Sequence, residues 1–207
     1  MQNGRTLFAC LLFVAASCLR GVSPAAAAEL KGEALFAALK QGDYIIYLRH
    51  TSTDTSQNDA DPIDVKDCAT QRNLSEDGRT MAKEIGAAFK ALSIGVDKVL
   101  SSPYCRTKDT AILAFGRAEP IDALFYTLGL PKERVQQAAD KLKEILATPP
   151  AAGKNNVVIG HNSNLKEAAG VWLKSEGDAF VLQPKGSGTF DVVGSFSAGE
   201  LIKASHQ

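Results

Sequence analysis

Two histidines and two arginines lie where reactive side chains are commonly found in layered proteins. The chain has three histidines, and two of them, His50 and His161, directly follow short apolar runs typical of buried strands. Arg49 precedes His50, and Arg106 lies shortly after a third such run. A neutral imidazole can attack phosphorus, while guanidinium groups bind phosphate oxygens bidentately. These residues predict phosphoryl-transfer chemistry, with His50 as the nucleophile and His161, if protonated, as a hydrogen-bond donor to the phosphate.

Composition restricts the kinds of partner. The formal net charge of zero argues against a general nucleic-acid binder, which needs clustered Lys and Arg. Neither a metal nor an organic cofactor is expected, because the arginines and an imidazolium would already neutralise a phosphate and would repel a divalent cation. The expected partner is therefore a small phosphorylated molecule or phosphate itself.

Strand-like and helix-like segments alternate along most of the chain. The pattern predicts buried strands at 44–48, 96–101 and 156–160, and helices at 30–40, 75–91, 104–115, 132–147 and from about 164. Two further β-like runs, 179–182 and 189–193, close the chain. This alternation predicts an α/β fold with a mainly parallel sheet. Ligands of such sheets bind beyond the carboxyl ends of the strands, where Arg49-His50, Ser101-Ser102 and Gly160-His161 are expected to meet.

The first 28 residues differ from the rest of the chain. Arg5 precedes a mostly apolar run at 7–19, and four alanines precede Glu29, which together predict a secretory signal peptide cleaved near Ala28. An uncleaved anchor is the alternative, although the run is shorter than the roughly 20 residues that span a bilayer; lipid modification of Cys18 is a lesser one. We expect one domain at 29–207, exported to a bacterial periplasm or secreted, and no stable membrane insertion after signal removal.

Two cysteines, Cys68 and Cys105, would remain after cleavage. An oxidising compartment favours a disulfide between them, and two free thiols are the alternative. Cys68 lies in a polar, aspartate-rich stretch at 51–73, which is long enough to predict a functional loop or lid. A bridge would pin this stretch beside Arg106.

Four segments resemble the histidine phosphatase superfamily, the group that also contains the cofactor-dependent phosphoglycerate mutases. They are LRHTSTDTS at 48–56, QRNLSEDGRTMA at 71–82, LSSPYCRTKDTA at 100–111 and VVIGHNSNL at 157–165, in the family's order. The resemblance implies a phosphoglycerate mutase-like three-layer sandwich. It also implies a phosphatase that hydrolyses phosphate monoesters through a phosphohistidine, without a metal.

The resemblance assigns roles to individual residues. His50 looks like the phosphorylated nucleophile. The other residues that look like part of the family's phosphate pocket are Arg49, Arg106 and His161. Thr53 falls where the family often has a Ser or Thr that contacts phosphate. Arg72 lies in the family's Arg-x-Leu-Ser/Thr segment, where it would either support the loop or contact the substrate.

The chain departs from the family pattern at several positions. Thr51 replaces the glycine that usually follows the Arg-His pair, and Asn162 stands where acid phosphatases and phytases carry Asp. The glutamate that serves many members as general acid is missing, with Tyr126 or Gly129 in its place. The acid that protonates the leaving group is therefore unassigned among Asp54, Asp122 and Glu133; Asp54 is preferred because it shares the loop after His50.

Two other functions stay open at this stage. A catalytically weak or inactive envelope protein that binds a phospho-ligand would account for the missing acid. A phosphoglycerate mutase would have the same pocket, but its substrates and cofactor are cytosolic, which the signal segment disfavours. The sequence assigns neither the natural substrate nor an oligomeric state.

Overall fold

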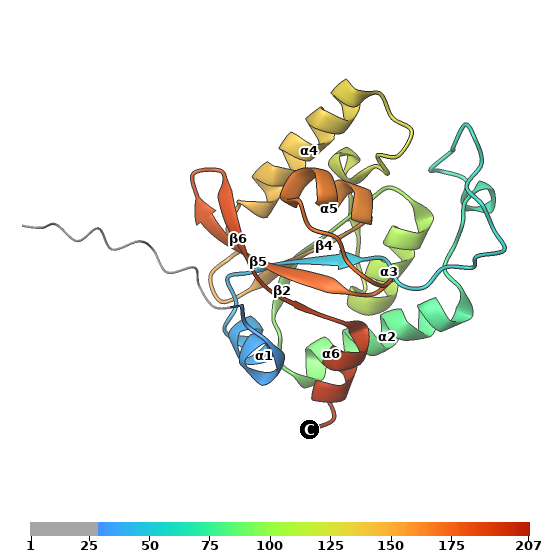
Figure 1. Ribbon diagram of the computed structural model, residues 1–207. Helices are drawn as coiled ribbons and strands as arrows, with labels where there is room; N and C mark the ends of the chain where they lie inside the picture. Colours follow the sequence, from blue (N-terminus) through green and yellow to red (C-terminus); the bar gives the residue numbers. More distant parts are fainter. Residues whose placement is uncertain (1–28) are drawn as a thin grey trace, which may run out of the picture.

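The computed structural model describes residues 29–207, so the expected signal peptide lies outside the described residues. A six-stranded sheet in the order β3-β2-β4-β1-β5-β6 runs through the centre of this part (Figure 1). The strands are β1 (Ile45–Arg49), β2 (Val96–Ser101), β3 (Glu119–Pro120), β4 (Asn155–Gly160), β5 (Ala179–Gly186) and β6 (Thr189–Phe196). The first four in the sheet order pair in parallel, whereas β5 is antiparallel to β1 and to β6. The predicted α/β fold with a mainly parallel sheet is confirmed.

Helices cover both faces of the sheet and make it the middle of three layers (Figure 1). One face packs against α1 (Gly32–Gln41), α2 (Glu76–Ala91), α3 (Cys105–Phe115) and α6 (Ala198–Ala204), and the other against α4 (Lys132–Leu146) and α5 (Asn162–Ala169). Along β1, Ile46 and Leu48 point into the first core, and Ile45 and Tyr47 into the second. Burial on both faces explains why this strand is a continuous apolar run.

The elements agree with the sequence patterns to within a few residues, apart from several short ones. The last two β-like runs lie in β5 and β6, which pair as an antiparallel hairpin. The sequence patterns did not predict β3, the 3₁₀ turn η2 (Asp122–Leu124) or the seven-residue helix α6. The start of α6 is fixed by a capping box, in which Ser197 and Glu200 each accept a hydrogen bond from the other's backbone N–H. None of the helices within residues 29–207 has the length and apolar character needed to cross a membrane.

Two adjacent parallel strands carry the two histidines to the same edge of the sheet. Arg49, the last residue of β1, is in register with Gly160, the last residue of β4, so His50 and His161 leave the sheet side by side. A Cβ at position 160 would overlap the Tyr47 hydroxyl, which donates a 2.9 Å hydrogen bond to the His161 carbonyl oxygen. Glycine at this position therefore allows Tyr47 to hold the backbone of His161.

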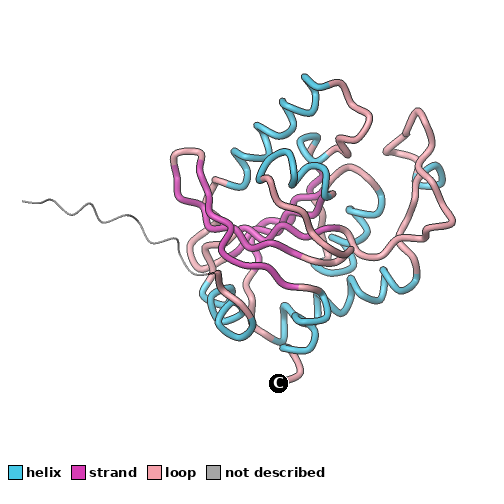
Figure 2. Tube along the Cα trace, viewed as in Figure 1, coloured by secondary structure: helices cyan, strands magenta, loops and turns pink. Residues whose placement is uncertain are grey.

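A long loop between β1 and α2, residues 50–75, extends from this edge (Figure 2). Its two ends meet through a bridge between Thr53 and Leu74 and a 3.0 Å hydrogen bond from the Ser75 N–H to the Ser52 carbonyl. Its far part, which contains the 3₁₀ turn η1 (Cys68–Thr70), is joined to the first residue of α3 by a Cys68–Cys105 disulfide, the pairing expected from the sequence. The β1–α2 loop is thus fixed both at its base and beside α3.

Candidate active site

A cavity of about 220 Å³ opens at the carboxyl ends of β1 and β4. The structure brings together here all four residues predicted to form the pocket, Arg49, His50, Arg106 and His161. The remaining walls are Asn58, Asp59, Arg72, Tyr126, Leu128, Asn162, Ser163 and Trp172. Three guanidinium groups against a single carboxylate give the lining a net positive charge that suits an anion.

The His50 ring is buried and held in one tautomer. Its Nδ1 atom lies 3.0 Å from the Thr51 carbonyl oxygen. Because a carbonyl oxygen only accepts hydrogen bonds, Nδ1 must carry the proton and Nε2 keeps its lone pair. Burial, together with the charges of Arg106 and Arg49, lowers the pKa of His50 from 6.5 to about 3, and the hydrogen bond to the Thr51 carbonyl only partly opposes this shift. His50 is therefore a neutral imidazole at neutral pH, the form that a nucleophile needs.

His161 faces His50, with their ring centroids 5.4 Å apart. Its Nε2 atom lies 3.0 Å from the Ser102 hydroxyl, and its Nδ1 atom is buried without a hydrogen-bond partner among the described residues. Burial, followed by the charge of Arg106, lowers the pKa of His161 well below 6.5. The protonated form considered from the sequence is thus disfavoured in the free protein, although a neutral ring still donates one N–H to an anion.

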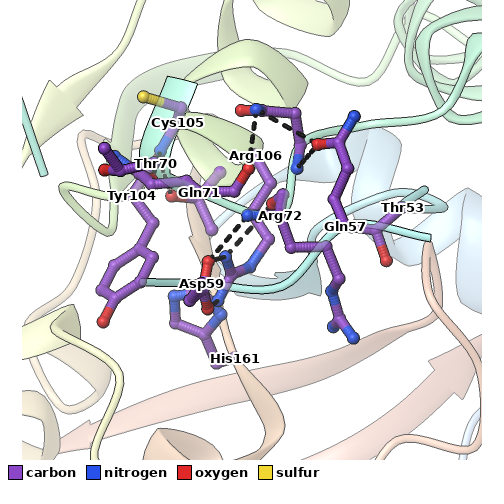
Figure 3. A network of polar contacts seen from close by, with 12 residues as sticks. Thr53, Gln57, Asp59, Thr70, Gln71, Arg72, Tyr104, Cys105, Arg106 and His161 are labelled. Atoms are coloured by element: carbon purple, nitrogen blue, oxygen red, sulfur yellow. Dashed lines mark hydrogen bonds and ion pairs between the residues drawn. The ribbon is translucent and has the colours of Figure 1, made fainter. Parts of the chain in front are cut away.

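Arg106 is almost fully buried and already has an anionic partner (Figure 3). Its Nη1 and Nη2 atoms donate to the two carboxylate oxygens of Asp59 at 3.0 and 3.2 Å, and Nη1 also donates to the Arg72 carbonyl at 3.3 Å. The guanidinium carbon lies 4.6 Å from the centre of the Tyr104 ring. The Nε atom is buried and, in this part of the chain, has no partner. One edge of the guanidinium therefore stays available for another acceptor.

Thr53 is not among the residues that line the cavity, and its contact with phosphate stays a prediction. Its backbone N–H and its hydroxyl both donate to the Glu176 carboxylate, each at 3.0 Å. The same carboxylate lies 3.3 Å from Arg49 and 3.8 Å from Arg72. Glu176, in the loop between α5 and β5, thus satisfies Thr53 and holds two of the cavity's arginines. Sequence reasoning missed Glu176, because its partners lie more than 100 residues away and no local pattern marks it.

Asp54, the preferred leaving-group acid, also lies elsewhere. It borders a separate surface hollow with Gln57 and Ser75. Its carboxylate accepts hydrogen bonds from the Ser56 hydroxyl at 2.7 Å and the Ser56 N–H at 3.0 Å, and these bonds lower the pKa of Asp54. Because this carboxylate lies outside the cavity lining, it is badly placed to give a proton to a substrate held there. The other two candidates, Asp122 and Glu133, are exposed and likewise outside the cavity lining.

Two departures from the family pattern have structural explanations. Asn162 makes a reciprocal pair of hydrogen bonds with the Leu173 backbone, at 2.9 and 3.0 Å, so its side chain fixes the segment after α5. Thr51 is fully buried, and its N–H and hydroxyl both lie 3.2 Å from the Thr110 hydroxyl on α3. The threonine that replaces the usual glycine therefore attaches the start of the β1–α2 loop to the helix that carries Arg106.

Comparisons with known proteins agree with this fold. The sequence model of the histidine phosphatase superfamily (branch 1) matches residues 45–124, a span that includes three of the four predicted pocket residues, Arg49, His50 and Arg106. Over this span the chain matches the histidine phosphatase superfamily. No curated protein matches it.

Solved structures share the architecture at low sequence identity. The protein histidine phosphatase SixA complexed with tungstate is 17% identical, with a TM-score of 0.54 over 76% of this chain and 99% of that one. A mycobacterial glucosyl-3-phosphoglycerate phosphatase with inorganic phosphate is 16% identical, with a TM-score of 0.55 over 76% and 99% of the two chains. A phosphoserine phosphatase from Entamoeba histolytica in complex with phosphoserine is 14% identical, with a TM-score of 0.50 over 76% and 98%. At these identities the likeness establishes the fold.

Proposed function

We propose that this protein is a phosphatase that hydrolyses phosphate monoesters through a phosphohistidine on His50, without a metal. The observation that carries the proposal is the state of the His50 ring: Nδ1 donates to the Thr51 carbonyl, and Nε2 is an unprotonated nitrogen on a ring that lines a cavity with three arginines. A nucleophile and a cationic phosphate cradle on one cavity are the two parts that phosphoryl transfer needs.

In this mechanism the phosphoryl group binds among the arginines with one oxygen directed at His161. The buried Nδ1 atom of His161 and the buried Nε atom of Arg106 are unpartnered polar groups within residues 29–207, and a phosphate oxygen would satisfy each of them. Their hydrogen bonds stabilise the equatorial oxygens while the phosphoryl group moves from the ester oxygen to Nε2 of His50. Water then hydrolyses the phosphohistidine and releases inorganic phosphate.

The mouth of the cavity suggests the kind of ester. Leu128 and Trp172 line it and are 64% and 56% exposed, and they are two of the four large apolar side chains that are exposed between residues 29 and 207. An exposed apolar pair beside a polar cavity is typical of a binding surface. We include in the proposal a substrate whose phosphate enters the arginine pocket and whose apolar or aromatic portion rests on this rim.

The proposal also includes export. Residues 1–28 have the composition of a signal peptide, and the Cys68–Cys105 disulfide suits an oxidising compartment such as the periplasm. Fractionation of cells that express the whole chain tests this part. A mature protein that begins near Glu29 in the periplasm or the medium supports it, whereas an uncleaved protein in the cytoplasm contradicts it.

Trapping of the phosphoenzyme tests the mechanism. Rapid alkaline quenching with a labelled phosphate ester is expected to trap alkali-stable, acid-labile label on the wild-type protein and none on His50→Ala. The variant should lose at least about a hundredfold in turnover, the contribution of one essential catalytic group. A wild-type protein that binds phosphate or vanadate yet never becomes labelled would instead be the phospho-ligand binder considered above.

A further inference from the structure

Asp59 is the only carboxylate among the residues that line the cavity in the described chain. It lies on the β1–α2 loop, and both of its oxygens accept hydrogen bonds from Arg106, whose Nε atom has no partner in the described chain (Figure 3). The backbone N–H of Arg72 also donates to it, at 2.8 Å. Asp59 is therefore held in place beside Arg106 in the cavity lining, with 27% of its side chain still exposed.

The leaving-group oxygen needs a proton, and the other titratable groups of the cavity are poorly suited to give one. His50 is the nucleophile, and burial keeps His161 neutral. The three arginines stay protonated. The hydroxyl of Tyr126 is the remaining candidate in the lining. Tyr104 also packs close to Arg106, but burial and the charge of Asp59 raise its pKa to about 12.

Binding of a phosphate dianion changes the surroundings of Asp59. In the free protein the charge of Arg106 is balanced by this carboxylate. When a dianion occupies the other edge of the same guanidinium, two anions share one cation, and uptake of a proton by the carboxylate relieves the repulsion. The proton would thus arrive beside the substrate only when a phosphoryl group is present.

We propose that Asp59 takes up a proton when the phosphoryl group binds and donates it to the leaving-group oxygen, an inference that rests on the proposed function. As the bond from phosphorus to Nε2 of His50 forms, the bond from phosphorus to the ester oxygen breaks, and its electron pair takes the proton of Asp59. In the second step water attacks phosphorus, the bond to Nε2 breaks, and the proton of the water returns to Asp59. When inorganic phosphate leaves, Asp59 releases this proton to water, so that the products are the free alcohol, inorganic phosphate and the starting enzyme.

Dependence on the leaving group tests the catalytic half of this inference. For Asp59→Asn, kcat/KM for propyl phosphate should fall by about 10²- to 10⁴-fold, the size of a general-acid contribution. For p-nitrophenyl phosphate, whose leaving group needs little protonation, it should fall by less than about tenfold. Tyr126→Phe is the matched control and should reduce kcat/KM for both substrates by the same factor. An equal loss on both substrates in Asp59→Asn, or a selective loss in Tyr126→Phe, would overturn the assignment.

Binding of sulfate, a dianion that does not titrate near neutral pH, tests the proton uptake without any turnover. In the wild-type protein its Kd should rise by up to about tenfold for each unit of increasing pH, as expected when one proton is taken up with the ligand. In Asp59→Asn the Kd for sulfate should be lower than that of the wild type at about pH 8. It should also be nearly independent of pH, because the negative charge of the Asp59 carboxylate, which competes with sulfate for Arg106, is gone. A pH dependence that persists in the variant would place the proton on His50 or His161 instead, and weaker binding would show that Asp59 only supports Arg106.

These two experiments separate the inference from the proposed function. If the wild-type protein never forms a phosphoenzyme, the proposed function fails, while sulfate binding still reports whether Asp59 takes up the proton. If the phosphoenzyme forms on His50 but Asp59→Asn shows no dependence on the leaving group, only the role of Asp59 is overturned.

Discussion

The side-chain oxygen of Gln71 accepts a 2.8 Å hydrogen bond from the backbone N–H of Cys105 (Figure 3). Gln71 is 2% exposed and lies in the β1–α2 loop, and Cys105 directly precedes Arg106 on α3. The Cys68–Cys105 disulfide links the same loop to the same residue. Two independent contacts therefore attach the loop that carries Asp59 to the helix that carries Arg106.

Removal of the disulfide should affect the β1–α2 loop more than the sheet. Cys68→Ser with Cys105→Ser opens a covalent link between residues 37 positions apart, for which loop-closure entropy predicts a loss of about 2–4 kcal/mol in the free energy of unfolding. Hydrogen exchange should accelerate most at 54–73 and least in β1 and β4. Non-reducing mass spectrometry that finds two free thiols in the mature protein, or uniform exchange after reduction, would contradict this expectation.

Replacement of Thr53 should affect stability rather than anion binding. Its hydroxyl donates to Glu176 and does not face the cavity, so Thr53→Val should cost about 1 kcal/mol of stability. Competitive inhibition by inorganic phosphate should change by less than about threefold, because the variant removes no phosphate contact. In contrast, Arg49→Gln should weaken phosphate binding by about 10- to 100-fold, the worth of one charged hydrogen bond. A loss in Thr53→Val as large as that in Arg49→Gln would restore the phosphate role expected from the sequence.

Stability should decline as the pH falls below about 6.5. The pKa of His50 is about 3 in the folded protein and near 6.5 when unfolded. Between these values the unfolded chain binds more protons than the folded one, so acid favours unfolding. This one group should contribute a slope of at most about 1.4 kcal/mol for each pH unit, and His161 acts in the same direction. Urea unfolding between about pH 4.5 and 6.5 should therefore show a shallower slope for His50→Gln than for the wild type.

Trp172 offers a direct signal for the leaving group, because it is the only tryptophan in the chain. Phenyl phosphate should change its fluorescence more than propyl phosphate at equal occupancy. Trp172→Ala should lower kcat/KM for phenyl phosphate by up to about tenfold, the energy of one aromatic contact, and leave propyl phosphate nearly unchanged. Ile112→Ala, another exposed apolar residue that does not line the cavity, is the control. An equal effect on both esters would argue against an apolar rim.

The sequence predicted the pocket better than the contacts around it. His50 and His161 follow runs that are buried on both faces, and parallel strands end at one edge, so their meeting could be inferred from patterns alone. Asp59 and Glu176 could not be singled out in this way. The stretch 51–73 contains five aspartates, and only the path of the loop decides which one faces Arg106. Asp54, the nearest to His50 along the chain, faces away because its carboxylate bonds to Ser56.

The matched ends of β1 and β4 also connect ligand affinity with folding. Neither strand alone presents more than one imidazole, and a one-residue slip in their pairing would turn one ring to the opposite face of the sheet. Partly folded chains in which these central strands have not yet paired should therefore have little affinity for phosphate. Inorganic phosphate should then raise the melting temperature through selective binding to the native state, and its binding during refolding should mark the moment at which the centre of the sheet closes.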